Sequence, residues 1–212
     1  MIILGIDPGT ASLGYGVVER TGQRLRSIDY GVISTSPKET LPHRLASIFG
    51  SLTELLELHN PGIMAVERLF FTRNVQTAFA VGQARGVVLL TAALRGIAVY
   101  EATPNEVKVA TAGHGAAAKE QVQRMVQAIL GLPEIPTPDD AADALAIAIC
   151  IAHRERQVGH IPTGPLDRSA IQPGDQGVTS YEKAVREALR RERLEATAKS
   201  RSTRTGKSHT AS

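Results

Sequence analysis

Carboxylates stand at three places in the chain where they could carry out chemistry together. Asp7 ends the apolar run "MIILGID", and Glu67 ends the apolar part of "IMAVERLF". Asp140 and Asp143 lie in the first turns of "DDAADALAIAI", which is apolar nearly all the way round, as in a buried helix. Buried carboxylates are costly unless they are paired or bind a cation. Oxygen ligands without a Cys or His cluster suit hard cations such as Mg²⁺ or Mn²⁺.

Simpler roles are open to the strand-end residues. Asp7 precedes Pro-Gly and could shape a turn. Glu67 could form a salt bridge with Arg68 or Arg73. Each role is plausible alone, but all four acidic positions together, in this order along the chain, favour a metal site.

The start of the helix separates its three aspartates into two groups. Thr137 is the expected N-cap and Pro138 the expected first helical residue. Asp139 and Asp140 then lie in the first turn, where the helix dipole favours negative charge, and for Asp139 this role suffices. At 100° per residue, Asp140 and Asp143 lie about 60° apart on one face of the helix. That face continues through Ile147 and Ile151, so the two aspartates extend an apolar stripe.

Strands and helices must bring these residues together. Apolar runs bounded by turn residues predict strands at 1–7, 13–20, 24–35, 62–71 and 97–104. Helical spacing predicts helices at 40–58, 74–96, 104–112, 117–131 and 138–154, with Asn74 and Gly96 bounding the second. Three antiparallel-type strands followed by alternating strands and helices imply a mixed sheet with helices on its faces. Ligand sites in such sheets collect beyond the carboxyl ends of strands.

Composition favours a cytoplasmic protein. Hydrophobic residues make up 42% of the 212 residues, enough for a full core, although only 4% are aromatic. The single cysteine excludes an internal disulfide and favours a reducing compartment. No apolar run approaches the length of a membrane span, and the N-terminus lacks the basic region of a signal peptide.

The last quarter of the chain differs from the rest. Residues 161–212 carry 10 Lys and Arg against 6 Asp and Glu, a net charge of +4, which leaves −1 for residues 1–160 of the total of +3. We predict a folded domain at 1–158 and a flexible basic tail at 159–212, with a short helix at about 180–198. A weak DNA contact is a hypothesis for the tail.

Five segments together resemble the RuvC family of Holliday-junction endonucleases, within the ribonuclease-H-like superfamily. They are "IILGIDPGTASLGYGVVE", "AVERLFF", "GQARGVVL", "GHGAAAKEQV" and "DDAADALAIAI", in order from residue 1 to about 155. The resemblance implies an α/β, ribonuclease-H-like fold, with a five-stranded mixed sheet and helices on both faces. It also implies a homodimer that resolves four-way DNA junctions in recombination and repair, by symmetric nicks that leave 5′-phosphate and 3′-hydroxyl ends.

The resemblance assigns roles to individual residues. The family's metal ligands match Asp7, Glu67, Asp140 and Asp143, which would hold two Mg²⁺ ions, with Mn²⁺ as a substitute. Some members have His at the position of Asp143, and the aspartate here keeps an all-oxygen site. Lys119 would support catalysis, although a single lysine is more often a solvated surface group.

DNA contacts are also expected near the site. The expected residues are Phe70, Phe71, Arg73, Lys108, Gly113 and Gly115. One phenylalanine would stack on an unpaired base at the crossover, and Phe70 matches the family better, while core packing is the alternative. The two glycines could let a loop approach a phosphate, but they do not form a Walker P-loop.

Gly82 and Gly86, four residues apart on a predicted helix, allow close helix approach. That approach could be a two-fold dimer contact or packing on the sheet. The resemblance also suggests partnership with a branch-migration complex of the RuvA and RuvB type.

Three other functions compete with this one. "GIDPGTASLGYG" is similar to the phosphate loop of actin-like ATPases, but their second loop is matched only by Asp29-Tyr30-Gly31, inside a predicted strand. A ribonuclease-H-like nuclease acting on RNA and a junction-binding protein that does not cleave are the others. The GQARG and DAADALAIA segments argue against the RNA nuclease. The intact acidic positions argue against the junction-binding protein that does not cleave.

Overall fold

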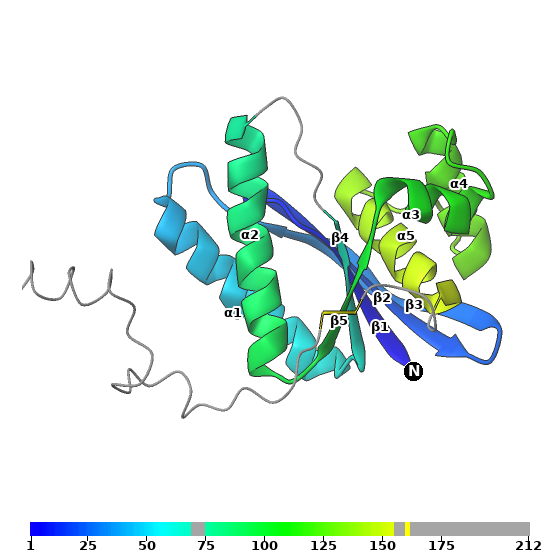
Figure 1. The fold of residues 1–212 in the computed structure, drawn as a ribbon, viewed down its shortest axis with the longest axis horizontal. Coiled ribbons are helices and arrows are strands. Elements are labelled where there is room, and N and C mark those ends of the chain that lie inside the picture. The colour runs from blue at the N-terminus through cyan, green and yellow to red at the C-terminus, as the bar shows by residue number, and fades with distance from the viewer. Residues whose placement is uncertain (69–74, 155–159, 162–212) are drawn as a thin grey trace, which may run out of the picture. The chain divides into compact units, whose positions relative to one another are not determined.

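The computed structural model describes residues 1–68, 75–154 and 160–161 (Figure 1). The chain divides into two units, Met1–Leu166 and Asp167–Ser212, and every described element belongs to the first. The predicted helix at 180–198 lies outside the described residues, and the predicted boundary at 158 stays a prediction. No helix in the described part is both long and apolar enough to cross a membrane.

One mixed sheet organises the described unit. Its strands are β1 (Ile2–Asp7), β2 (Ser12–Thr21), β3 (Arg24–Ser34), β4 (Ile63–Glu67), β5 (Ala98–Ala102) and β6 (His160–Ile161). Their order across the sheet is β3-β2-β1-β4-β5-β6. The three central strands, β1, β4 and β5, run parallel, and the others pair antiparallel to their neighbours. The fold class is confirmed and all five predicted strands are present, although β4 ends at Glu67 and not at the predicted residue 71. The two-residue β6 adds to the edge beside β5.

Helices cover both faces of the sheet (Figure 1). They are α1 (Leu41–His59), α2 (Val75–Leu94), α3 (Pro104–Ala112), α4 (Lys119–Leu130) and α5 (Asp139–Arg154). The helices α1 and α2 pack on one face around residues such as Leu4, Ile48 and Val88. The other three pack on the opposite face, around residues such as Ile3, Val126 and Ile149.

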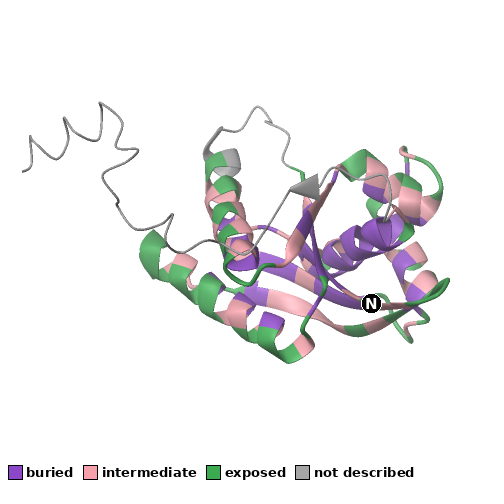
Figure 2. Cartoon of the chain, turned by 60° about the horizontal axis from the view of Figure 1, so that its bottom comes forward, coloured by how far each residue is buried: buried purple, intermediate pink, exposed green. Residues whose placement is uncertain are grey.

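The helix α5 is buried on nearly every side, as its apolar sequence predicts (Figure 2). It can lie this close to the sheet because β1 and β2 carry glycines beneath it. A Cβ added at Gly5 would stand 2.0 Å from the carbonyl oxygen of Ala144, and one at Gly14 would stand 2.0 Å from that of Asp140. The glycines therefore set the depth at which α5 and its aspartates sit.

Two helix starts differ in kind. Thr103 caps α3 in a full capping box with Glu106, whose side chain accepts from the Thr103 amide at 2.8 Å. The predicted N-cap of α5 at Thr137 is wrong by one residue, because the helix begins at Asp139 and the Pro138 carbonyl accepts from the amide of Ala141 at 3.0 Å.

Candidate active site

Two strand ends bring the first two carboxylates together. The strands β1 and β4 are parallel neighbours in which Ile6 is paired with Val66, so Asp7 and Glu67 end the two strands side by side. Side chains alternate between the faces of a strand. Ile63 and Ala65 contact the α5 side of the core, so Glu67, two residues further on, points to that same side.

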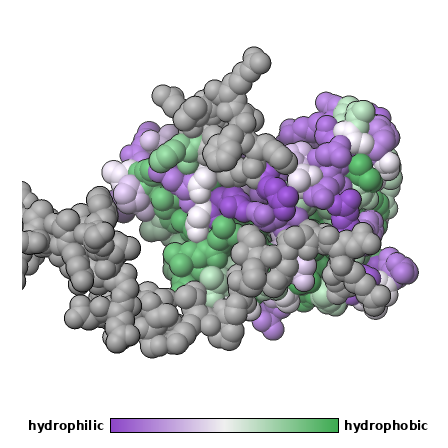
Figure 3. Space-filling view, in the orientation of Figure 1, coloured by the Kyte–Doolittle hydropathy of each residue, from purple (hydrophilic) through white to green (hydrophobic). Residues whose placement is uncertain are grey.

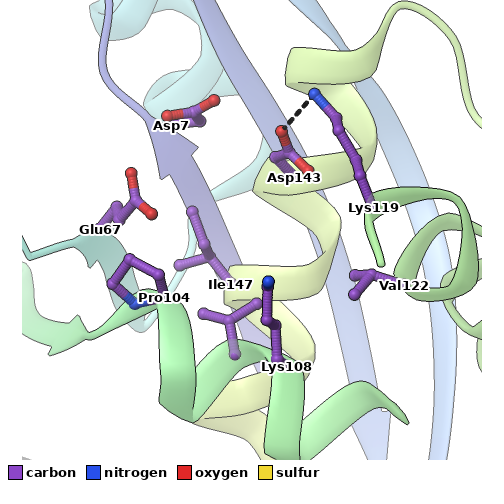
Figure 4. Close-up of a pocket in the computed structure, with 9 residues that line it drawn as sticks. Asp7, Glu67, Pro104, Lys108, Lys119, Val122, Asp143 and Ile147 are labelled. Atoms are coloured by element: carbon purple, nitrogen blue, oxygen red, sulfur yellow. Dashed lines mark ion pairs between the residues drawn. The ribbon is translucent and has the colours of Figure 1, made fainter. Parts of the chain in front are cut away.

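The helix α5 supplies the other two carboxylates from above the same strands. Asp143 is partly buried and faces Asp7 and Glu67 across a cleft (Figure 4). Asp140 does not line this cleft. It accepts a short hydrogen bond from the hydroxyl of Ser12, at the start of β2.

The cleft between these elements holds about 300 Å³. Its lining consists of Asp7, Glu67, Pro104, Val107, Lys108, Lys119, Val122, Asp143 and Ile147. Apolar side chains from α3, α4 and α5 form part of the wall, while the carboxylates and the two lysines project into the opening (Figure 4). A partly apolar wall lowers the local dielectric, which strengthens interactions between the charges inside.

The carboxylates raise one another's proton affinity. Burial, followed by the charges of Glu67, Asp143 and Asp140, raises the pKa of Asp7 from 3.8 to about 7. Burial and the charge of Asp143 raise the pKa of Glu67. Burial also raises the pKa of Asp143, although Lys119 opposes the change. Asp140 contributes to the field at Asp7 although it does not line the cleft.

Among the described residues, Lys119 is the basic side chain that forms ion pairs with this acidic cluster. Its Nζ lies 3.2 Å from Asp143 Oδ2 and 3.2 Å from Asp139 Oδ2. Burial lowers the pKa of Lys119, but the bonds to the two aspartates outweigh that effect and raise it. Lys108 lines the same cleft from α3 (Figure 4).

The donor set fits a hard divalent cation. The cleft presents three carboxylate groups, those of Asp7, Glu67 and Asp143. A cation bound between them would relieve their mutual repulsion. In the arrangement seen, however, no three His, Cys, Asp or Glu side chains of the described residues form a ready ligand group. Asp143 is turned to Lys119 and would have to turn toward a bound cation, whereas Asp140 bonds Ser12 through Oδ2 and would offer a cation its Oδ1.

The simpler interpretation of Glu67 finds no support in the described residues. Arg68 does not pair with Glu67, because its Nε lies 3.3 Å from Glu101 Oε2. Arg85 of α2 bonds the other oxygen of Glu101, on β5. Glu101 thus holds Arg68, the neighbour of Glu67 in the chain, together with Arg85 of α2. Arg73, the other proposed partner, lies outside the described residues.

The predicted DNA contacts are only partly described. Phe70 and Phe71 lie outside the described residues, as Arg73 does. Gly113 ends α3 in a left-handed conformation, with φ of 83°. Gly115 packs against Asn105, and a Cβ there would stand 1.9 Å from the Asn105 side-chain oxygen. Both glycines therefore have structural roles, and their DNA contact stays a prediction.

Three contributors to the site escaped the sequence analysis. Ser12 fixes Asp140, Glu101 holds Arg68 next to Glu67 in the chain, and Asp139 bonds Lys119. Their partners are far away in the sequence, as with Ser12 and Asp140, which are 128 residues apart. Only Asp139 carried a signal, its position in the acidic start of α5, and helix-dipole stabilisation already explained that position.

Comparisons with known proteins agree on one family. A family model described as crossover junction endodeoxyribonuclease RuvC matches residues 3–151. The chain is similar to the crossover junction endodeoxyribonuclease RuvC of Desulfitobacterium hafniense, with 56% identity over 153 residues that make up 72% of this chain and 93% of the relative. It is similar to the corresponding protein of Moorella thermoacetica, with 56% identity over 164 residues, 74% of this chain and 98% of the relative.

A solved structure also matches the described fold. The RuvC of T. thermophilus in complex with Holliday junction substrate superposes with a TM-score of 0.72 at 43% identity. That match covers 76% of this chain and 99% of the other.

Proposed function

Since this chain belongs to the RuvC family of crossover junction endodeoxyribonucleases, we propose that it resolves Holliday junctions by hydrolysing one phosphodiester bond in each of two strands. The observation that carries the proposal is the cleft between Asp7, Glu67 and Asp143, where partly buried carboxylates face one another with raised pKa values. A bound divalent cation would relieve this repulsion.

We propose Asp7, Glu67, Asp140 and Asp143 as ligands of two Mg²⁺ ions. Bound ions would supply the positive charge that activates the attacking water and stabilises the leaving 3′ oxygen, so that the products carry a 5′-phosphate. Asp7 is the best candidate for a shared ligand, because it lies at the end of a central strand between Glu67 and α5. Asp140 would keep its bond to Ser12 through one oxygen and offer the other to a cation.

The lysines would act on the phosphate. Lys108 and Lys119 project into the cleft from different helices, so their ammonium groups could flank a phosphate held at the carboxylates (Figure 4). Cationic donors that meet a phosphate at the reacting centre stabilise the charge that develops there.

A homodimer through α2 suits the symmetric substrate. An apolar stripe follows the exposed side of α2, opposite its buried residues, and hydrophobic surface gathers over this helix in Figure 3. The stripe consists of Phe79, Gly82, Gly86, Leu90 and Leu94. A Cβ added at Gly82 or Gly86 would meet nothing within 4 Å, so packing on the sheet does not require these glycines. Glycines cost helix stability, and a second copy of α2 approaching closely would account for them.

Two further features remain predictions. The resemblance predicts partnership with a branch-migration complex of the RuvA and RuvB type, and the composition, not the resemblance, predicts the cytoplasmic location.

The test is cleavage of a labelled synthetic four-way junction by wild type and Asp140→Asn, with Mg²⁺ or EDTA. We expect paired nicks that need the metal and disappear in the variant, while junction binding persists. Equal cleavage of an RNA duplex would redirect the proposal to an RNA nuclease. Binding without cleavage in Mg²⁺ or Mn²⁺, across several junction sequences, would contradict nuclease activity.

A further inference from the structure

The first turns of α4 and α5 are joined by Asp139, which uses both of its carboxylate oxygens. Oδ2 lies 3.2 Å from Lys119 Nζ, and Oδ1 accepts from Gln123 Nε2 at 3.0 Å. Lys119 and Gln123 are four residues apart, so they lie on one face of α4 and both bind the Asp139 carboxylate. The helix-dipole role predicted from the sequence needs neither contact.

Lys119 is shared between two carboxylates of different kinds. Asp143 lines the cleft and is one of the proposed cation ligands, whereas Asp139 is not among the lining residues and its side chain is 65% exposed. A cation that takes the Asp143 oxygen competes with the ammonium group for it. Asp139 lies outside that competition and can hold the ammonium group whether or not the cation is bound.

We propose that Asp139 is a positioning residue that holds Lys119 at the rim of the cleft and thereby frees Asp143 for a divalent cation. This inference rests on the proposed function, because it needs Asp143 to bind the metal. Without Asp139, Lys119 would keep Asp143 as its carboxylate partner among the described residues, and each cation bound would have to displace it. Loss of Asp139 should therefore weaken cation binding through Lys119.

The alternative is a merely structural ion pair. Exposed ion pairs contribute little to stability, so removal of the Asp139 charge should hardly change unfolding in either case. A direct effect of the Asp139 charge on the cation is a second alternative. It would act equally whether or not Lys119 is present, which separates it from the proposal.

The test measures binding of Mn²⁺ or Mg²⁺ alone to the full chain by titration calorimetry, without DNA. The variants are Asp139→Asn, Lys119→Met and the double variant, with Glu120→Gln as the control. Glu120 is an exposed acid beside Lys119 in the chain, and no ion pair joins it to a described residue. We expect Asp139→Asn to weaken cation binding about two- to fivefold, the effect of one exposed charge pair, and Glu120→Gln to change it less.

The double variant decides the mechanism. With Lys119→Met already present, adding Asp139→Asn should leave the cation affinity unchanged. In the otherwise wild-type protein, Asp139→Glu keeps a carboxylate for Lys119 and should retain most of the wild-type cation affinity. An unchanged affinity in Asp139→Asn, or an equal loss in the Lys119→Met background, would overturn the positioning role while leaving the nuclease proposal intact. If the wild type bound no cation and cleaved no junction, the metal site itself would be wrong and this inference would fall with it.

Discussion

Asp7 shows what a single buried carboxyl group costs this fold. Its pKa rises from 3.8 to about 7, so the folded protein holds a proton there that the unfolded chain releases. Stability from this group is complete below about pH 4 and is lost as the pH rises toward 7. The group therefore opposes folding at neutral pH in the absence of metal, and its use must lie in function.

Replacing this residue should stabilise the metal-free protein. We expect Asp7→Asn to raise the free energy of unfolding at pH 7 to 8 by on the order of 2–4 kcal/mol, since one pKa unit corresponds to about 1.4 kcal/mol. The gain should shrink as the pH falls and approach zero only below pH 3.8, where the wild-type group becomes protonated in the unfolded chain as well. Urea unfolding in EDTA from pH 4 to 8 measures it, and cleavage should be abolished in the same variant. A gain independent of pH would contradict the raised pKa.

Ser12 gives a prediction with little cost in stability. Its hydroxyl holds Asp140, so Ser12→Ala should leave that carboxylate without a fixed orientation. We expect about a tenfold fall in cleavage rate, in the range for lost partners of metal ligands. Ser27→Ala is a matched control, because the Ser27 hydroxyl is buried without a partner among the described residues. Ser27→Ala should leave cleavage unchanged, and an equal loss in both variants would refute the role of Ser12.

At the scale of the elements, α5 determines where Asp140 and Asp143 lie, and the strands β1 and β2 determine where α5 lies. The carbonyl oxygen of Asp140 would stand 2.0 Å from a Cβ at Gly14, far inside van der Waals contact. Gly14→Ala should therefore push the first turn of α5 away from β2, lower stability by about 1–3 kcal/mol and reduce cleavage.

Gly50→Ala is the control for this substitution. Gly50 is an exposed glycine of α1, and a Cβ there would meet nothing within 4 Å. Alanine should stabilise that helix by about 0.5–1 kcal/mol and leave cleavage intact. Thermal unfolding and a junction assay measure both variants. Equal stability of Gly14→Ala and wild type would show that α5 does not depend on this glycine.

The same contrast explains how far the sequence could predict the molecule. Period-two and helical patterns are local, so the strands ending at Asp7 and Glu67 and the all-apolar α5 were predictable from their own residues. That Asp7 and Glu67 lie close together followed from the rule that ligand sites collect beyond the carboxyl ends of strands. The contacts of Ser12 and Glu101 depend on side chains brought together only by packing, and nothing in a local pattern indicates them.

At the scale of the whole molecule, the two faces of the sheet have different tasks. The α5 face carries the carboxylates, while the α2 face carries the apolar stripe of Phe79, Gly82, Gly86, Leu90 and Leu94. Glu101 connects the two tasks, because it bonds Arg85 of α2 and Arg68, the neighbour of Glu67. Dimer formation along α2 would thus occur on a helix tied directly to the end of β4.

Charging the stripe should separate the subunits without unfolding them. Leu90 is 51% exposed, so Leu90→Asp adds a charge where the single subunit loses little packing, but where a second α2 would bury it. We expect the variant to sediment as a monomer with wild-type thermal stability in dilute solution. Paired nicks in one junction should fall sharply, because each encounter would bring one active site in place of two.

Leu58→Asp tests whether any exposed leucine would do the same. Leu58 is 74% exposed on α1 and is not part of the stripe, so its substitution should leave both the dimer and the paired nicks intact. If Leu90→Asp stayed dimeric, or if Leu58→Asp dissociated equally, the contact would lie elsewhere. The open space at Gly82 and Gly86 would then need another explanation, because two glycines in one exposed helix lower its stability and the described packing makes no use of them.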